Sequence, residues 1–101
     1  MADEIKLTEL KIKMWRGDTQ LYSHQKVVGQ TVDSSATQDA SAAFADETQM
    51  LTAYNTGNGC NFLIDDNPST TVTAANSDYL AANERRDLLV EPGQYFHSKQ
   101  V

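Results

Sequence analysis

Hydrophobic and polar residues alternate along the beginning of this chain, which predicts a β-strand. Between Ile5 and Met14, apolar side chains alternate with lysine and glutamate, so that one face of an extended segment is apolar. The phase changes by one residue near Thr8 and Glu9, which indicates a β-bulge or break. An amphipathic helix is the alternative, because several of the same apolar residues fit a 3.6-residue period. We favour the strand, since no capping residue precedes the segment.

The middle of the chain, from Gln49 to Asp65, predicts a β-hairpin. Two short apolar runs, Met50–Tyr54 and Cys60–Ile64, flank the segment Thr-Gly-Asn-Gly. Asn-Gly after an alternating strand is a strong hairpin signal, because both residues tolerate the positive φ of a primed turn. One hairpin is not stable alone in water, so we expect further strands to cover it. Cys60 falls on the inward face, where we expect a buried, unreactive thiol.

The remaining sequence predicts several short strands separated by turns. Turn signals recur at Asn58-Gly59, Asn67-Pro68, Asn76 and Pro92-Gly93. Strands are expected near residues 20–23, 26–32, 70–74 and 95–99, with Phe44 anchored in the core after a polar connection over 33–41. Pro followed by Gly at 92–93 suits a type II turn with a positive φ at the glycine. This spacing predicts an all-β fold, a small antiparallel sandwich or barrel.

The length of 101 residues corresponds to one domain. Within it we expect an extended N-terminal arm or strand with a hairpin over residues 1–29, and a β-sandwich body over residues 30–101. No run approaches the ~20 apolar residues of a membrane span, and the first residues lack the apolar core of a signal peptide. We therefore expect no membrane partner and no secretion.

The chain is acidic, with a formal net charge of −6, but its charge is unevenly distributed. The first 30 residues carry five basic and four acidic side chains, whereas the other 71 carry three basic and ten acidic ones. An acidic body repels the phosphates of nucleic acids, so we expect no nucleic-acid partner. The weakly basic N-terminal third suits an acidic protein surface.

Few side chains have the spacing of a catalytic or metal-binding motif. The single cysteine excludes an internal disulfide and a cysteine zinc site. His24 and His97 have no partner at ligand spacing, although either could pair in space with a downstream carboxylate; we expect structural histidines. Residues 65–67 (Asp-Asp-Asn) offer oxygen ligands to a hard cation, but a solvated turn is favoured. Residues 16–18 (Arg-Gly-Asp) are interpreted as a turn. We predict no enzyme, metal or cofactor.

Trp15 is the most informative single aromatic residue. It lies next to Arg16 in a polar segment, and an exposed tryptophan beside an arginine is typical of a binding hot spot. A core anchor that covers one edge of the sheet is an equally good interpretation.

Several segments in the last two thirds of the chain follow an order known from one protein family. These segments are Gln30–Ser35, Ser41–Phe44, Gln49–Tyr54, Cys60–Ile64, Asn67–Thr71, Tyr79–Leu80 and Leu89–Gln94. The order resembles that of short structural proteins encoded in the virion gene clusters of tailed bacteriophages. The chain departs from the family pattern at Ala81, where proline is common, and at Asp65-Asp66, which replaces a glycine-containing turn.

The resemblance implies a non-enzymatic virion protein that decorates or cements the outer capsid surface after synthesis in the host cytoplasm. It implies that the partner is the major capsid protein and that the chain is a homo-oligomer, with a trimer favoured by the threefold axes of a shell. An N-terminal arm would then add to a neighbour's sheet edge. The residues expected to bind the partner are Trp15, Ile12, Met14 and Tyr22 as anchors, with Lys11 and Lys13 providing electrostatic steering.

Two other functions are compatible with the sequence. A head–tail connector or tail component would form a larger ring. A carbohydrate-binding β-sandwich would use Tyr79, Trp15 or Tyr95 as stacking platforms and would be monomeric.

Overall fold

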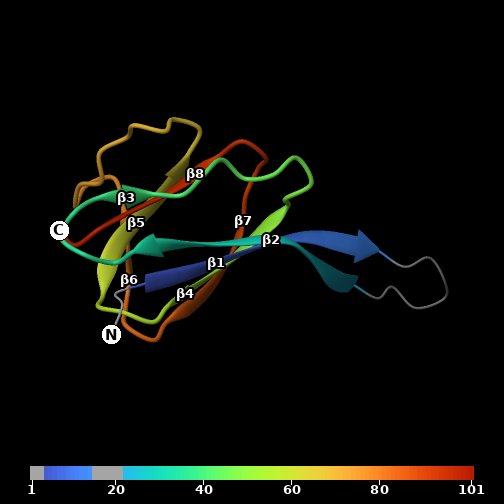
Figure 1. Cartoon of the computed structure of the whole chain (residues 1–101), viewed down its shortest axis with the longest axis horizontal. Helices are drawn as coiled ribbons and strands as arrows, with labels where there is room; N and C mark the ends of the chain where they lie inside the picture. The colour runs from blue at the N-terminus through green and yellow to red at the C-terminus, as the bar shows by residue number, and fades with distance from the viewer. Residues whose placement is uncertain (1–3, 15–21) are drawn as a thin grey trace.

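Two antiparallel β-sheets pack face to face in the computed structural model, which describes residues 4–14 and 22–101 (Figure 1). The strands are β1 (Glu4–Met14), β2 (Tyr22–Asp33), β3 (Asp39–Ala40), β4 (Met50–Asn55), β5 (Cys60–Asp65), β6 (Asp78–Leu80), β7 (Arg85–Leu89) and β8 (Tyr95–Lys99). The strand order is β2-β1-β4-β7 in one sheet and β3-β8-β5-β6 in the other. The predicted all-β, sandwich-like fold is therefore confirmed. The described residues contain no helix long and apolar enough to cross a membrane.

The core lies between the two sheets and draws side chains from both. Ile5 and Leu7 of β1 pack with Leu51 of β4, and all three are almost fully buried. From the other sheet, Phe62 and Phe96 stack with their ring centroids 5.2 Å apart. Burial of such side chains stabilises each by roughly 1.5–3 kcal/mol relative to an exposed position, so this layer holds the two sheets together.

A register shift lies where the sequence predicts a bulge or break in the first strand, but β1 itself runs on without an extra residue. The register between β1 and β2 shifts between Glu9 and Leu10, because Glu9 pairs with Val28 and Leu10 pairs with Lys26. The extra residue is Val27 of β2, so the bulge lies on the partner strand. The predicted closing strand over 95–99 and the anchoring of Phe44 are confirmed.

The predicted hairpin between β4 and β5 is wrong. Both strands exist, but β4 pairs with β1 and β7, whereas β5 pairs with β6 and β8 in the other sheet. The Asn55 side chain stabilises the turn after β4. It accepts a hydrogen bond from the Gly57 amide (2.9 Å) and donates one to the Asn58 carbonyl (2.7 Å). Neither Asn58 nor Gly59 has a positive φ. Gly59 instead allows the Tyr79 side chain to pack against the backbone, because a Cβ at this position would clash with the Tyr79 hydroxyl.

The predicted strand over residues 70–74 is also absent. This segment belongs to the β5–β6 loop (residues 66–77), and its backbone bonds to side chains rather than to a strand. The Val72 amide donates to Gln38 Oε1 (2.9 Å), and the Thr73 amide donates to Asn76 Oδ1 (2.8 Å). Polar side chains thus replace the ladder that the β-branched sequence suggested.

The boundary expected between residues 29 and 30 lies within one sheet of the structure. That boundary falls inside β2, a single strand that merges the two segments expected over 20–23 and 26–32. The first half of β1 is part of the body, because it lies between β2 and β4 and contributes Ile5 and Leu7 to the core. Only the far ends of β1 and β2 resemble an arm.

Candidate interaction surface

A two-stranded ribbon, defined here as residues 11–14 of β1 and 22–26 of β2, projects from the body (Figure 1). The pairing of β1 with β4 ends at Leu10, whereas its pairing with β2 continues to Met14. Beyond Leu10 the ribbon therefore lacks the third and fourth strands of its sheet. The edges of such a ribbon have no neighbouring strand, and edges of this kind are suited to strand addition by another chain.

The structure brings most of the predicted partner-binding residues together on this ribbon. Lys11 pairs with Gln25, Ile12 with His24, Lys13 with Ser23, and Met14 with Tyr22. Trp15 and the Arg-Gly-Asp segment lie outside the described residues, so their proposed roles stay predictions.

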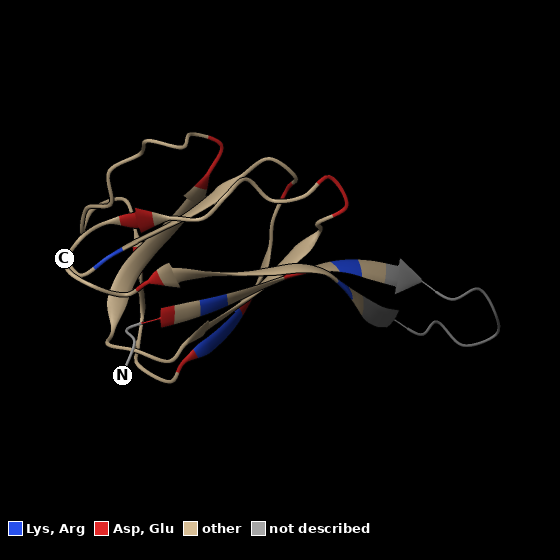
Figure 2. Cartoon of the chain, viewed as in Figure 1, with Lys and Arg blue, Asp and Glu red and all other residues tan. Residues whose placement is uncertain are grey.

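The charge of this part of the chain is opposite to that of the body. Residues 11–26 carry four basic side chains and one acidic one, a net charge of +3, and the rest of the chain has a net charge of −9. Figure 2 shows basic positions on the strands where they leave the body and acidic positions on the loops of the body. A charge separation of this kind orients the molecule as it approaches a charged partner.

The base of the ribbon is fixed by residues that precede β4. The Gln49 amide donates to the Leu10 carbonyl (2.9 Å), and the Gln49 side chain accepts a hydrogen bond from the Ile12 amide (2.8 Å). Lys11 Nζ lies 3.5 Å from Glu47 Oε2. These contacts set the direction in which the ribbon leaves the body.

Glu9 is a buried carboxylate at the same place, with only 1% of its surface exposed. Its Oε1 accepts hydrogen bonds from the Ala45 amide (2.7 Å) and the Thr48 hydroxyl (2.8 Å). Its Oε2 accepts one from the Gln30 side-chain amide (3.0 Å). These three donors offset part of the cost of removing the carboxylate from water.

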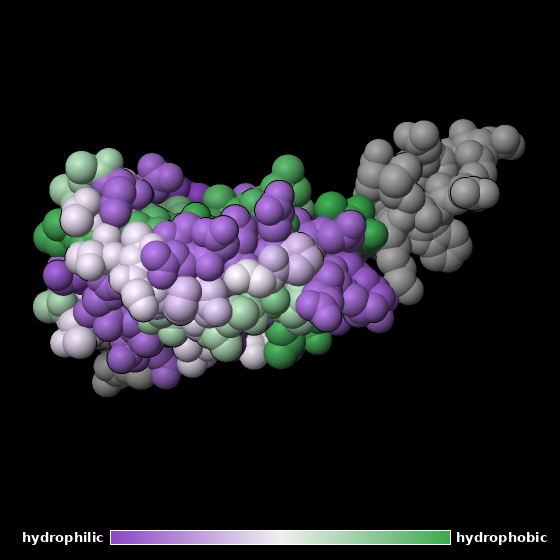
Figure 3. Space-filling model, turned by 90° about the horizontal axis from the view of Figure 1, so that it is seen from above, coloured by the Kyte–Doolittle hydropathy of each residue, from purple (hydrophilic) through white to green (hydrophobic). Residues whose placement is uncertain are grey.

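A groove of about 490 Å³ opens beside Glu9, and we call it the Glu9 groove. Its other lining residues are Val27, Val28, Gln30, Ala42, Ala43 and Ala45. The walls are therefore mainly apolar, and the bulged Val27 forms part of them. Seen from above, hydrophobic residues lie beside the end of the body from which the ribbon leaves (Figure 3).

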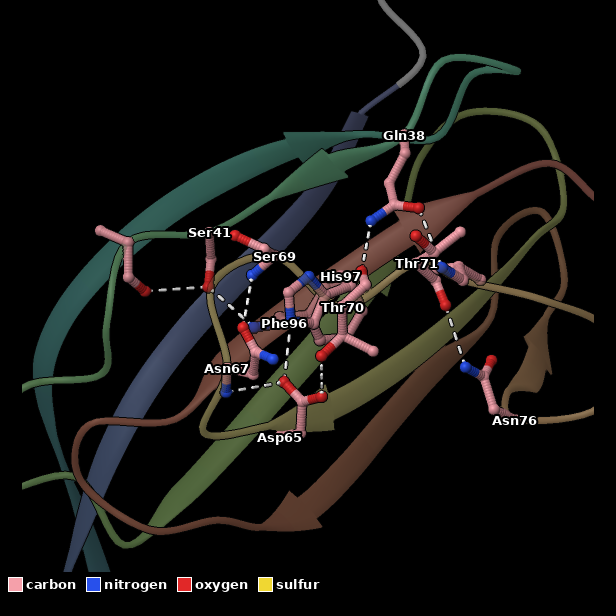
Figure 4. Close-up of polar contacts among 12 residues, drawn as sticks. Gln38, Ser41, Asp65, Asn67, Ser69, Thr70, Thr71, Asn76, Phe96 and His97 are labelled. Atoms are coloured by element: carbon pink, nitrogen blue, oxygen red, sulfur yellow. Dashed lines mark hydrogen bonds and ion pairs between the residues drawn. The ribbon is translucent and has the colours of Figure 1, made fainter.

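A second polar cluster joins β5, β8 and the β5–β6 loop (Figure 4). Asp65 Oδ1 lies 2.9 Å from Nε2 of the buried His97 and accepts a hydrogen bond from the Asn67 amide (3.1 Å). Asp65 Oδ2 accepts one from the Thr70 hydroxyl. Burial raises the pKa of Asp65, but the hydrogen bonds from these three residues outweigh it and hold the pKa below its usual value.

This cluster lacks the arrangement of a nucleophilic catalyst. A hydroxyl nucleophile must bond to a base that a third group orients. Here the Thr70 hydroxyl bonds to Asp65, and Nδ1 of His97 has no hydrogen-bond partner among the described residues. Within residues 4–14 and 22–101, no three histidine, cysteine, aspartate or glutamate side chains form a group that could hold a metal ion. The cluster fastens the loop to the sheet.

The other candidate side chains are dispersed. Burial raises the pKa of Cys60 to about 11, so the thiol stays protonated, as expected for a buried cysteine. Tyr79 is 58% exposed and faces Asn61 of β5, whereas Tyr95 pairs with Asp65 at the other end of that strand. The two tyrosines therefore do not form one stacking platform.

No protein-family model, curated protein or solved structure matches this chain. The candidate site is therefore defined by the geometry of this chain, and its central residue, Glu9, was not predicted from the sequence. Glu9 occupies a position in phase with Ile5 and Leu7 on the buried side of β1. A charged residue in phase with core residues was the signal that could have identified it.

Proposed function

We propose that this chain is a non-enzymatic virion structural protein that decorates or cements a tailed-phage capsid by means of its ribbon. The observation that carries the proposal is the ribbon itself, a basic two-stranded projection from an acidic sandwich. The resemblance of the remaining sequence to phage virion proteins supplies the partner, the major capsid protein.

The proposed mechanism uses backbone and charge rather than chemistry. The free edges of the ribbon pair with a strand of the capsid protein, and basic residues such as Lys13 and Lys26 steer it toward an acidic surface. Contacts that exist only in the assembled shell stabilise that shell by mass action. A trimer fits the local threefold axes of a shell and multiplies the contacts of each copy.

The first test measures the number of copies of this chain in purified particles of the phage that encodes it, by quantitative mass spectrometry. A decoration protein is expected at a fixed number of copies per particle, similar in magnitude to the number of copies of the major capsid protein. A copy number equal to one ring per particle would replace this proposal with the connector, and absence from the particles would overturn it.

The second test separates the ribbon from general electrostatics. Lys13→Glu combined with Lys26→Glu reverses two charges on the ribbon, and Lys6→Glu combined with Lys99→Glu reverses two on the body. We expect the ribbon variant to bind capsids at least tenfold more weakly than the body variant in a co-sedimentation assay. Equal losses in both variants would contradict a specific role for the ribbon.

A further inference from the structure

The carboxylate of Glu9 forms no ion pair with a cationic side chain within the described residues. Its hydrogen-bond donors are an amide, a hydroxyl and the side-chain amide of Gln30, all of them neutral. Two of these donors share Oε1, so Oε2 has a single partner and retains the capacity to accept another. A buried carboxylate is stabilised most by an opposite charge, and the described residues supply none here.

The Glu9 groove has the shape and lining of a site for an alkyl cation. Glu9 is one of its lining residues, and valines and alanines, including the half-exposed Val28, make up most of the others. The aliphatic stems of lysine and arginine bury well against apolar walls while their heads bind carboxylates. An anionic ligand would be repelled by Glu9, and a purely apolar one would leave the carboxylate without a counter-charge.

We propose that the Glu9 groove accepts the side chain of an arginine or lysine from the protein partner, with the cationic head at Glu9 Oε2. This inference deepens the proposed function and rests on it for the source of the cation. The outer edge of β2 begins beside the groove, where the Gln30 side chain bonds to both backbone groups of Ala42. Gln25, Lys26 and Val28 pair with β1 alone, and among the described residues no further strand lies on their other side. A partner strand added along this edge directs alternate side chains toward the groove.

The groove is tested with small probes, independently of any capsid. The full chain, labelled with ¹⁵N, is titrated with propylguanidinium, which has the end of an arginine side chain, and with propylurea, its neutral analogue. We expect saturable shifts of the amide signals of Val27, Val28 and Ala42–Ala45 with propylguanidinium, at roughly millimolar affinity because the probe is small. Propylurea should bind at least tenfold more weakly. Equal binding of the two probes, or no saturable shift, would overturn the proposal.

Two variants localise the site. Glu9→Gln should reduce the affinity for propylguanidinium at least tenfold, and Ala43→Leu should block the groove while leaving Glu9 and its donors in place. Unchanged binding by Ala43→Leu would overturn the proposal even if Glu9→Gln failed to fold.

Failure of this inference is distinguishable from failure of the proposed function. A chain that binds capsids through its ribbon but never binds propylguanidinium would contradict the groove alone. Saturable, Glu9-dependent binding by a chain that is absent from phage particles would contradict the capsid role and leave the groove as a cation site.

Discussion

The two halves of β1 differ in what surrounds them, although they form one continuous strand. The first half, up to Leu10, lies between β2 and β4 and buries Ile5 and Leu7 under the second sheet. The second half, Lys11 to Met14, pairs with β2 alone. Burial therefore constrains the sequence of the first half, and the second half is free to carry residues that serve a partner. The bulge and Glu9 lie at the boundary between the two halves of β1.

The largest expected effect is a contrast in stability between these halves. Leu7→Ala removes a fully buried side chain and should lower the free energy of unfolding by roughly 2–5 kcal/mol. Ile12→Ala on the ribbon should lower it by less than about 1 kcal/mol, because Ile12 is only partly buried. Urea unfolding measures both. A cost for Ile12→Ala as large as that for Leu7→Ala would show that the ribbon is part of the core.

The next effect compares two glutamates at the boundary. Glu9→Ala leaves three hydrogen-bond donors without their acceptor, among them the Ala45 amide and the Thr48 hydroxyl. It should lower the free energy of unfolding by about 2–4 kcal/mol. Glu47→Ala removes an exposed ion pair with Lys11 and should cost no more than about 0.5 kcal/mol. Similar midpoints for the two variants in urea would contradict a structural role for the buried carboxylate.

A smaller effect compares two glycines. Gly93 has a φ of +82°, so Gly93→Ala should destabilise the body by about 1 kcal/mol through backbone strain alone, since a Cβ there meets no atom. Gly29 of β2 lacks a positive φ, and a Cβ there makes ordinary contacts. Gly29→Ala should therefore be neutral or slightly stabilising. Thermal unfolding of both variants checks this order.

The smallest effect concerns acid stability. The pKa of Asp65 is below its usual value of 3.8 in the folded protein, so its hydrogen bonds stabilise the fold above that value. This contribution should disappear as the pH falls below about 4, because protonation removes the acceptor. In melting temperatures measured from pH 2 to 7, Asp65→Asn should show a smaller acid-induced decrease than the parent chain. Asp66→Asn, the exposed control, should show the same decrease as the parent chain, and a decrease as small as that of Asp65→Asn would contradict the prediction.

The sequence predicted the elements whose signals are local, and it failed where side chains from distant elements decide. The alternation in β1 and the positive φ at Gly93 are set by neighbouring residues, and both were confirmed. The sheet assignment of β4 and β5 depends on Asn55 and on the pairing of β4 with β1, which the Asn-Gly signal does not report. The surroundings of Glu9 come from three segments far apart in the chain, so the groove could not be predicted.

The ribbon was only partly predictable for the same reason. Its residues were identified from charge and aromatic content, but its length depends on where the pairing with β4 ends. That end point, at Leu10, is a property of the third strand rather than of the ribbon sequence.

We expect the body to fold without the ribbon and the ribbon to bind the partner. Lys11 and Gln25 are directly paired, so residues 12–24 can be replaced by an Asn-Gly turn that closes the shortened hairpin. The decisive measurement is co-sedimentation of the shortened and the full chain with capsids that lack the native protein. The free energy of unfolding of the shortened chain should lie within about 1 kcal/mol of that of the full chain, and the shortened chain should stay in the supernatant. Sedimentation of a folded, shortened chain to the same extent as the full chain would contradict this expectation.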